Sequence, residues 1–450
     1  MGKIISKFIC HECGYETPKW LGKCPGCSAW NSLLEESISK KPARRAAERV
    51  TAIPLNQLSA EDSQRFSSGL SELDRVLGGG IVPGSLILLG GDPGIGKSTL
   101  LLQVAGLIAA SGKKVLYLSG EESLQQIRLR AGRLGINSDR IFLLNEQDID
   151  LLHEYINELD PDLIIIDSIQ TVYSSKISSI PGSVSQLRES TATVMQIAKK
   201  MDKAVFLVGH VTKDGALAGP KVLEHIVDVV VYFEGEKNFS FRLLRAAKNR
   251  YGATDEIALL EMSGQGLVEV PDPSYAFLSQ LQEECSGTAI VASIEGSRPL
   301  LIELQALVSS LGAGYPRRMV SGIDQNRLSL IIAVLEKRRG YKLSACDVYL
   351  KVSGGVFLKD PSVDLGIAAA VLSSYLEKPL ALDTVFIGEI SLSGQIRPVS
   401  FLDLRLKEID RMGYKRVIVP NSPGRSLSAY NLEVLEVKSL DNFIDLVLEG

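Results

Sequence analysis

The chain has no long hydrophobic run, no excess of basic residues and few cysteines. No apolar run among its 450 residues approaches the length of about 20 residues that spans a bilayer. The first residues contain no apolar core of a signal peptide, so we expect a cytoplasmic protein without membrane contact. The formal net charge of −4 excludes nucleic-acid binding over the whole surface and confines such contacts to loops or to the channel of a ring.

The six cysteines are too few and too clustered for a disulfide scaffold, and they fit a reducing compartment better. Four of them form two C-x-x-C pairs separated by ten residues: Cys10, Cys13, Cys24 and Cys27. These pairs can place four thiolates around one tetrahedral Zn²⁺, whose binding would supply the folding energy of so small a unit. A redox dithiol would need a βαβ pattern beside one C-x-x-C, and none is present. We predict a four-cysteine zinc finger over residues 1–30.

A basic linker is expected over residues 31–55. Its charge comes from Lys40, Lys41, Arg44, Arg45 and Arg49, and Pro42 interrupts it. We interpret this segment as a solvated tether, and the alternative is an arm that binds DNA phosphates.

Residues 91–98 form a complete G-x-x-x-x-G-K-S phosphate loop. Its residues are Gly91, Asp92, Pro93, Gly94, Ile95, Gly96, Lys97 and Ser98. The apolar run before it predicts a buried strand, and the segment from Thr99 to residue 110 predicts a helix. Backbone N–H groups of such a loop and the helix N-terminus bind phosphate. Lys97 would reach the β- and γ-phosphates and Ser98 would bind Mg²⁺, so we predict binding of ATP and Mg²⁺.

Residues 56–270 alternate strand and helix patterns and predict an α/β core. Apolar runs at 114–119, 163–167 and 204–209 join the run before the phosphate loop as expected strands. Such continuous apolar strands separated by helices indicate a parallel sheet covered on both faces. Residues 271–288 are expected to be a linker, and residues 289–450 a further α/β unit.

Polar residues stand where these expected strands end, and ligands of parallel sheets bind at that edge. Asp167 fits a carboxylate of the Mg²⁺ shell, and either Glu121 or Glu122 could polarise the attacking water. His210 could sense loss of the γ-phosphate, and the alternative is a partly buried histidine with satisfied hydrogen bonds.

Further motifs extend the pattern to the whole chain. The segments 66–70 (Phe-Ser-Ser-Gly-Leu), 77–80 (Leu-Gly-Gly-Gly) and the phosphate loop resemble the RecA-type recombinase and helicase core. With the four-cysteine unit and the pentapeptide Lys-Asn-Arg-Tyr-Gly at 248–252, the chain is similar to the RadA (Sms) family of bacterial DNA repair proteins. The family pentapeptide usually has Phe where this chain has Tyr251.

This resemblance implies several roles. It favours Glu121 over Glu122 as the catalytic glutamate, and it places His210 where RecA has a phosphate-sensing glutamine. Lys248 and Arg250 resemble cations that reach the nucleotide of a neighbouring subunit, in the manner of arginine fingers; the alternative is a solvated pair on an edge strand. Loops at 173–190 and 212–221 are expected to face DNA in the lumen of a ring.

Residues 349–450 resemble the proteolytic domain of Lon through the stretches 351–355, 359–362 and 388–398. Ser362 lies near the serine position of a Ser-Lys dyad. Counting from Gly394, Asp403 holds the place of the lysine and Lys407 lies about one helical turn away, so we expect a scaffold without the dyad. A DNA-binding or ring-closing surface is expected from Arg317, Arg318, Lys337, Arg338 and Arg339, unless these are ordinary charged surface.

Together these features predict a DNA-dependent ATPase of helicase type that drives branch migration in homologous recombination and DNA repair. Its expected partners are single-stranded and branched DNA, a RecA-type recombinase and further copies of itself in a hexameric ring. An ATP-dependent Ser-Lys peptidase and a nucleotide-switched DNA clamp without translocation are the alternatives.

Overall fold

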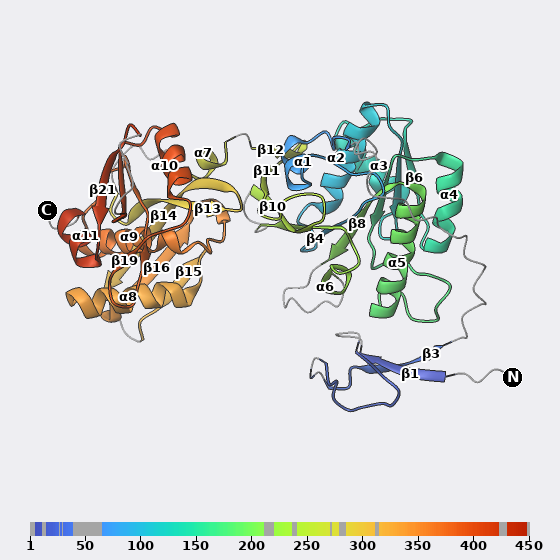
Figure 1. Cartoon of the computed structure of the whole chain (residues 1–450), viewed down its shortest axis with the longest axis horizontal. Coiled ribbons are helices and arrows are strands. Elements are labelled where there is room, and N and C mark those ends of the chain that lie inside the picture. The colour runs from blue at the N-terminus through green and yellow to red at the C-terminus, as the bar shows by residue number, and fades with distance from the viewer. Residues whose placement is uncertain are drawn as a thin grey trace, which may run out of the picture. The chain divides into compact units, whose positions relative to one another are not determined.

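The computed structural model describes residues 5–10, 15–26, 28, 30–38, 65–210, 220–235, 241–270, 272–278, 285–310, 315–422 and 430–447. The chain divides into two compact units (Figure 1). Unit 1 comprises Met1–Lys237 and Arg242–Glu269, and unit 2 comprises Asn238–Phe241 and Val270–Gly450.

The N-terminal part of unit 1 is a small antiparallel sheet in the order β2-β1-β3. The strands are β1 (Ile5–Cys10), β2 (Glu16–Thr17) and β3 (Leu33–Ile38). Cys10 pairs with Leu33 across the sheet, and both lie with Cys24 in a small buried cluster. β3 lies in the segment that the sequence predicts as a linker. This strand was not predicted because it forms by pairing with β1, which is remote in the sequence.

The main sheet of unit 1 has nine strands in the described part of the chain, in the order β12-β11-β10-β9-β4-β8-β7-β5-β6. Six neighbouring strands are parallel: β4 (Leu86–Gly91), β5 (Val115–Ser119), β6 (Ile141–Leu144), β7 (Leu163–Asp167), β8 (Ala204–His210) and β9 (Val229–Glu234). All four predicted strands are confirmed, as β4, β5, β7 and β8. The sheet is nevertheless mixed, because it continues into β10 (Phe241–Asn249), β11 (Ile257–Ser263) and β12 (Gly266–Glu269), where β10 runs antiparallel to β9 and β12 to β11.

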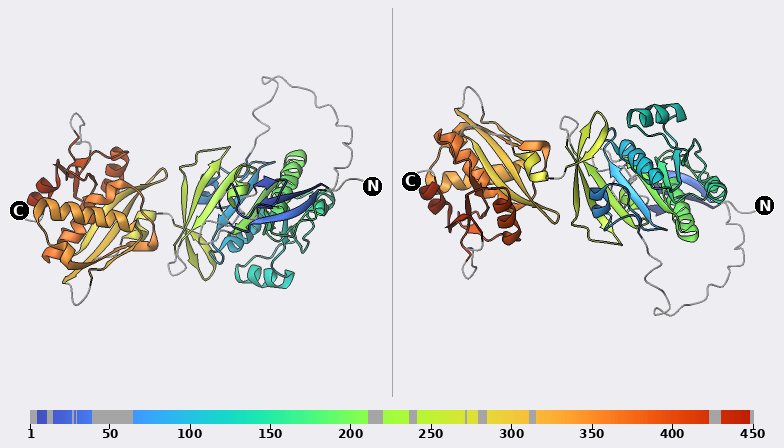
Figure 2. Two further views of the ribbon diagram at one scale, coloured as in Figure 1. Left: turned by 90° about the horizontal axis from the view of Figure 1, so that it is seen from below. Right: turned by 90° about the horizontal axis from the view of Figure 1, so that it is seen from above.

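Helices cover both faces of this sheet (Figure 2). The alternating side chains of β4 show why: Ile87 and Leu89 belong to one buried cluster, and Leu86 and Leu88 to another. The first cluster includes residues of α1 (Ser71–Val76), α2 (Lys97–Ala110) and α3 (Leu124–Arg133). The second includes α4 (Leu152–Leu159), α5 (Val184–Met201) and α6 (Pro220–Leu223).

Unit 2 is built on a mixed sheet in the order β15-β16-β14-β13-β17-β20-β21. Its strands are β13 (Thr288–Glu295), β14 (Arg298–Ser310), β15 (Arg318–Ser321), β16 (Cys346–Val352), β17 (Thr384–Phe386), β20 (Arg416–Pro420) and β21 (Glu433–Val437), with a hairpin of β18 (Glu389–Ile390) and β19 (Ile396–Arg397). Its helices are α7 (Pro273–Phe277), α8 (Gln325–Arg339), α9 (Asp364–Leu376), α10 (Leu402–Arg411) and α11 (Leu440–Val447). Among the described residues of both units, no helix is long and apolar enough to cross a membrane.

Candidate functional site

The phosphate loop connects β4 to α2. Gly96 precedes the helix with φ 119°, and a side chain there would come within 2.8 Å of the Met262 methyl group. Only glycine combines this backbone conformation with so little space. The helix begins at Lys97, two residues before the predicted start at Thr99. The last two residues of the phosphate loop therefore lie in the first helical turn, whose N–H groups have no partner within the helix. Such a turn is a binding site for phosphate.

Lys97 lies across the loop and is nearly buried, with 3% of its surface exposed. Its Nζ donates hydrogen bonds to the carbonyl oxygens of Gly91 at 2.7 Å and Asp92 at 2.9 Å. Burial lowers the pKa of Lys97 to about 8, although the nearby carboxylates of Asp167, Glu121 and Asp92 act in the opposite direction. The loop therefore holds a cation whose charge is sensitive to pH just above neutrality.

Asp167 ends β7 beside Ser119, the last residue of β5. Its carboxylate is buried, and Oδ2 accepts a hydrogen bond of 2.6 Å from the hydroxyl of Tyr117. Burial and the Asp167 charge raise the pKa of Tyr117 well above its usual value, so the hydroxyl stays a donor. Tyr117 thereby orients a carboxylate that, with the hydroxyl of Ser98, offers the hard oxygen ligands that Mg²⁺ prefers.

Glu121 has neighbours from two other strand ends. Its Oε1 accepts a hydrogen bond from Ser168 Oγ at 2.5 Å and lies 3.0 Å from His210 Nε2. Glu122 instead bonds to the guanidinium of Arg130 on α3. The structure thus distinguishes the two glutamates that sequence reasoning left as alternatives, and only Glu121 belongs to the cluster at the strand ends.

The strand register explains why these residues meet. Gly91 pairs with His210 across β4 and β8, and Ser119 pairs with Asp167 across β5 and β7. These four strands are neighbours in the order β4-β8-β7-β5. Their carboxyl ends therefore gather the phosphate loop, Asp167 and His210 at one edge, as a parallel sheet requires. A cavity of about 240 Å³ adjoins the loop and is lined by Gly91, Asp92, Ile95, Tyr232, Phe233, Glu234 and Gly235.

Lys248 and Arg250 lie toward the other end of the sheet. Their neighbour Asn249 pairs with Val229, which pairs with Ile87, four residues before Gly91. Four residues of a strand span about 13 Å. The two cations are therefore not brought together with Lys97 within one subunit.

Both cations have partners in their own chain. Lys248 Nζ donates hydrogen bonds to the carbonyl oxygens of Glu224 at 2.6 Å and Val227 at 2.7 Å. Arg250 Nη1 lies 3.0 Å from the carboxylate of Asp228. Sequence reasoning missed Asp228, whose only signal is a lone carboxylate in front of an apolar strand.

Asp228 is buried and connects three elements. Its Oδ2 accepts a hydrogen bond from the backbone N–H of Leu86 at the start of β4 and lies 2.9 Å from Lys199 Nζ on α5. Lys199 also donates a hydrogen bond of 2.9 Å to the hydroxyl of Tyr251. Tyr251, the fourth residue of the pentapeptide at 248–252, therefore joins this network.

Two of the four predicted zinc ligands lie among the described residues. Cys10 and Cys24 are buried, and Cys24 Sγ accepts a hydrogen bond from the N–H of Gly26 at 3.3 Å. An N–H group directed at sulfur stabilises a thiolate, so the described donors fit a metal site. Cys13 and Cys27 lie outside the described residues; within that part of the chain no group of three His, Cys, Asp or Glu side chains could hold a metal.

Ser362 in unit 2 is buried beside an arginine. Arg405 Nη1 donates a hydrogen bond to Ser362 Oγ at 2.8 Å, and Nη2 lies 2.6 Å from Asp360. Asp403 and Lys407 are exposed on α10. Counting residues from Gly394 therefore did not identify Arg405 as the cation that contacts Ser362. Because a guanidinium does not accept a proton, this pair cannot act as a Ser-Lys dyad.

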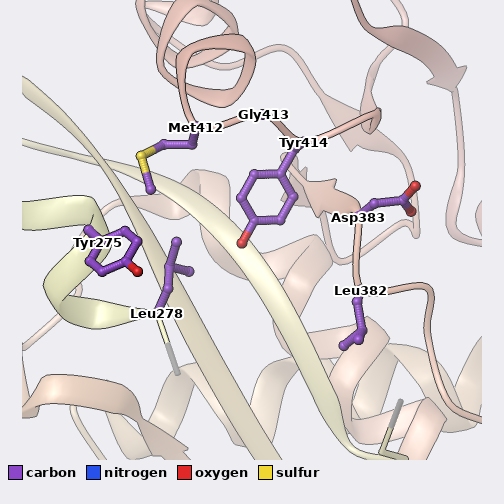
Figure 3. Close-up of a pocket in the computed structure, with 7 residues that line it drawn as sticks. All are labelled: Tyr275, Leu278, Leu382, Asp383, Met412, Gly413 and Tyr414. Carbon is purple, nitrogen blue, oxygen red and sulfur yellow. The ribbon is translucent and has the colours of Figure 1, made fainter. Parts of the chain in front are cut away.

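A separate cavity of about 370 Å³ in unit 2 contains none of the predicted site residues (Figure 3). It is lined by Tyr275, Leu278, Leu382, Asp383, Met412, Gly413 and Tyr414. Burial raises the pKa of Tyr414 to about 12, so its hydroxyl remains protonated and offers no nucleophile near neutral pH.

The predicted DNA-facing loops are only partly described. Residues 211–219, which contain most of the second loop, lie outside the described residues. The first loop is shorter than expected, because Ser183 caps α5 through a hydrogen bond to the N–H of Gln186. The helix therefore begins at Val184, inside the segment expected to be loop.

Three family models match separate parts of the chain. They are the AAA domain over residues 51–216, the rubredoxin metal binding domain over residues 8–35, and subunit ChlI of Mg-chelatase over residues 327–423. With the parallel strands described above, these matches confirm the predicted fold class: a RecA-type P-loop core, an N-terminal zinc-ribbon unit and a C-terminal Lon-like α/β unit.

Curated proteins are similar to the chain over nearly its whole length. DNA repair protein RadA of Bacillus subtilis is 51% identical over 427 residues, which cover 93% of both chains. The proteins of the same name from Halalkalibacterium halodurans and Listeria monocytogenes are each 49% identical, over 100% and 97% of both chains. Among solved structures, that of the KaiC-like protein PH0186 from Pyrococcus horikoshii OT3 is 21% identical, with a TM-score of 0.40, and aligns with 46% of this chain and 100% of that chain.

Proposed function

Because the chain belongs to the RadA family of DNA repair proteins, we propose that it is a DNA-dependent ATPase acting as a helicase-type motor. It promotes branch migration of recombination intermediates, with single-stranded and branched DNA as substrates and a RecA-type recombinase as partner in the cytoplasm. The observation that carries the proposal is the meeting of the phosphate loop, Asp167, Glu121 and His210 at one edge of the sheet.

Each residue of this edge has a task in hydrolysis. The N–H groups of the loop, including those of Lys97, Ser98 and Thr99, bind the phosphates of ATP, and Lys97 neutralises charge on the β- and γ-phosphates. Ser98 and Asp167 would hold Mg²⁺, which would offset negative charge on the phosphates of ATP. Glu121 orients the attacking water and accepts its proton.

His210 connects the site to a DNA-binding loop. It contacts the catalytic carboxylate through Nε2, and the predicted loop at 212–221 begins two residues later in the sequence. A change at the γ-phosphate that moves His210 away from Glu121 therefore also moves the start of that loop. This linkage is what a motor needs to couple hydrolysis to movement along a strand.

Lys248 and Arg250 are assigned to the active site of a neighbouring subunit. The register that separates them from their own phosphate loop by about 13 Å supports action in trans. Hydrolysis then requires an assembly, for which we propose a hexameric ring. Asp228 of the same subunit lies 3.0 Å from the Arg250 guanidinium and positions it for the neighbour's site. In the N-terminal unit, the four cysteines Cys10, Cys13, Cys24 and Cys27 would hold zinc, whose binding would stabilise the fold of that unit.

ATP hydrolysis with and without single-stranded DNA tests the proposal. We expect DNA to raise the rate, and Lys97→Ala and Lys248→Ala each to abolish the increase. A rate that ignores DNA, or ATP-gated DNA binding without movement of a labelled branched junction, would overturn the motor in favour of a clamp.

Mixing two inactive variants tests the action in trans. Glu121→Gln subunits have an intact Lys248 and Arg250, whereas Lys248→Ala subunits have an intact phosphate loop and Glu121. Mixed rings should recover part of the hydrolysis, because one variant completes the site of the other. Failure to recover activity in rings shown by mass to contain both variants would place Lys248 outside the neighbour's site.

A further inference from the structure

The N-terminal unit exposes large aromatic side chains that hydrolysis does not use. The 450 residues include only two tryptophans, Trp20 and Trp30, and both belong to this unit. Trp20 is 54% exposed and Trp30 is 72% exposed. Large apolar groups gathered at a protein surface mark a binding site more often than chance, so this pair requires an explanation.

Backbone contacts hold the two rings on either side of one glycine. Lys23 and Trp30 form an antiparallel bridge, and Asn31 N–H donates a hydrogen bond of 2.8 Å to the carbonyl oxygen of Gly22. A methyl group placed on Gly22 would lie 3.7 Å from Trp30 Cζ3 and 3.8 Å from Trp20 Cη2. The two rings are therefore neighbours on a hydrogen-bonded turn rather than independent side chains.

The charged residues in the stretch that carries the two rings are basic, and Glu16 and Glu35 bound this stretch. Residues 17–34 contain Lys19 and Lys23 but no aspartate or glutamate, although acidic residues outnumber basic ones in the whole chain. The ammonium group of Lys23 lies 5.9 Å from the centre of the Trp30 ring. Both lysines are exposed, so the surface offers aromatic planes and cations side by side.

We propose that this tryptophan face, formed by Trp20, Trp30, Lys19 and Lys23, binds single-stranded DNA. Bases stack on the two rings while the lysines contact phosphates, a combination that recognises single strands without regard to sequence. A duplex hides the faces of its bases, so it would contact only the lysines. The absence of carboxylates in residues 17–34 favours a polyanion over a protein partner. The inference rests on the DNA-dependent function proposed above and assigns a second contact for the same strand.

Intrinsic fluorescence tests the proposal without any label on the protein. Because the chain has only these two tryptophans, emission excited beyond tyrosine absorption reports on this face alone. We expect oligo(dT) added to the full-length, zinc-loaded protein to quench that emission. Quenching should saturate at the DNA concentration at which the anisotropy of a labelled oligo(dT) saturates, and added salt should reverse it.

Substitutions then measure the contribution of each ring. Trp20→Ala and Trp30→Ala should each weaken oligo(dT) binding by about tenfold, the order expected for one lost stacking contact. Trp30→Phe should retain most of the affinity, because the phenyl ring still stacks. Leu129→Ala on α3 is a matched control, since Leu129 is also 72% exposed. Bound zinc per chain verifies that each variant is folded.

The outcomes separate this inference from the proposed function. If DNA binds and stimulates hydrolysis while tryptophan emission and the affinity of both alanine variants stay unchanged, only the tryptophan face is refuted. If emission responds to a RecA-type recombinase and not to DNA, the face is a protein-binding site and the inference is likewise overturned. If no DNA binds or stimulates hydrolysis at all, the proposed function fails as well.

Discussion

Two adjacent glutamates show how neighbours decide chemistry at the scale of a residue. Glu121 contacts Ser168 and His210, whereas Glu122 pairs with Arg130. We expect Glu121→Gln to lower kcat for ATP hydrolysis by about 10²–10⁴-fold, because an amide cannot accept the proton of water. Glu122→Gln is the matched control: it removes a partly exposed ion pair that contributes about 1 kcal/mol or less, so kcat should change little. Equal losses of kcat in the two variants would contradict the assignment.

Lys97 gives a second prediction at this scale, in the pH dependence of ATP binding. Burial lowers its pKa in the folded chain from 10.5 to about 8. Below that pH the lysine is charged and attracts phosphate fully. As pH rises through about 8 it loses its proton, so ATP affinity should fall. Bound phosphates favour the charged form, and binding near pH 8 should therefore take up protons.

Titration calorimetry in buffers of different ionisation enthalpy measures that proton uptake. Lys97→Met is the control, since it keeps a flexible side chain of similar length without a titratable group. The same proton uptake in wild type and Lys97→Met would assign the titration to another group.

At the scale of elements, the sequence predicted four strands whose pattern is complete within a short window, but the equally apolar strand β9 was not identified. β4, β5, β7 and β8 are buried on both faces, so each appears as an uninterrupted apolar run. β6 was missed because it lies at the sheet edge and is only half-buried. β10 was missed because polar residues interrupt it and it is antiparallel to β9. Edge and antiparallel strands depend on partners that no local pattern specifies.

The candidate ATP site was likewise predictable from the sequence only in part. Gly91, Asp167 and His210 could be placed together because each ends a strand of one parallel sheet. The bond from Ser168 to Glu121 and the pairing of Arg250 with Asp228 join residues that are 47 and 22 positions apart. Arg405 reaches Ser362 over 43 positions. Such contacts depend on how helices and turns approach the sheet, so they could not be predicted from residue spacing.

At the scale of the whole molecule, the two units have separate hydrophobic cores. Clusters on both faces of the large sheet stabilise unit 1, and a cluster including Val385, Leu406 and Val417 stabilises unit 2. The charged groups singled out above are also divided, since the phosphate loop belongs to unit 1 and the buried Arg405–Asp360 ion pair to unit 2. Compact units with their own cores can unfold separately, which leads to a test on the full chain.

We expect calorimetry to resolve two unfolding transitions that respond to different perturbations. ATP with Mg²⁺ should raise the transition temperature of unit 1 alone, because it binds only that unit and only in its folded state. Arg405→Ala should lower the transition temperature of unit 2 alone. The expected loss in its free energy of unfolding is roughly 3–5 kcal/mol, because the substitution leaves the Asp360 carboxylate buried without its cation. Arg416→Ala is the matched control in the same unit, since it breaks an exposed ion pair with Glu433 that contributes about 1 kcal/mol or less. A single transition shifted by both ATP and Arg405→Ala would mean that the units unfold as one. Equal losses of unit 2 stability in the two arginine variants would mean that burial does not increase the contribution of the Arg405–Asp360 pair.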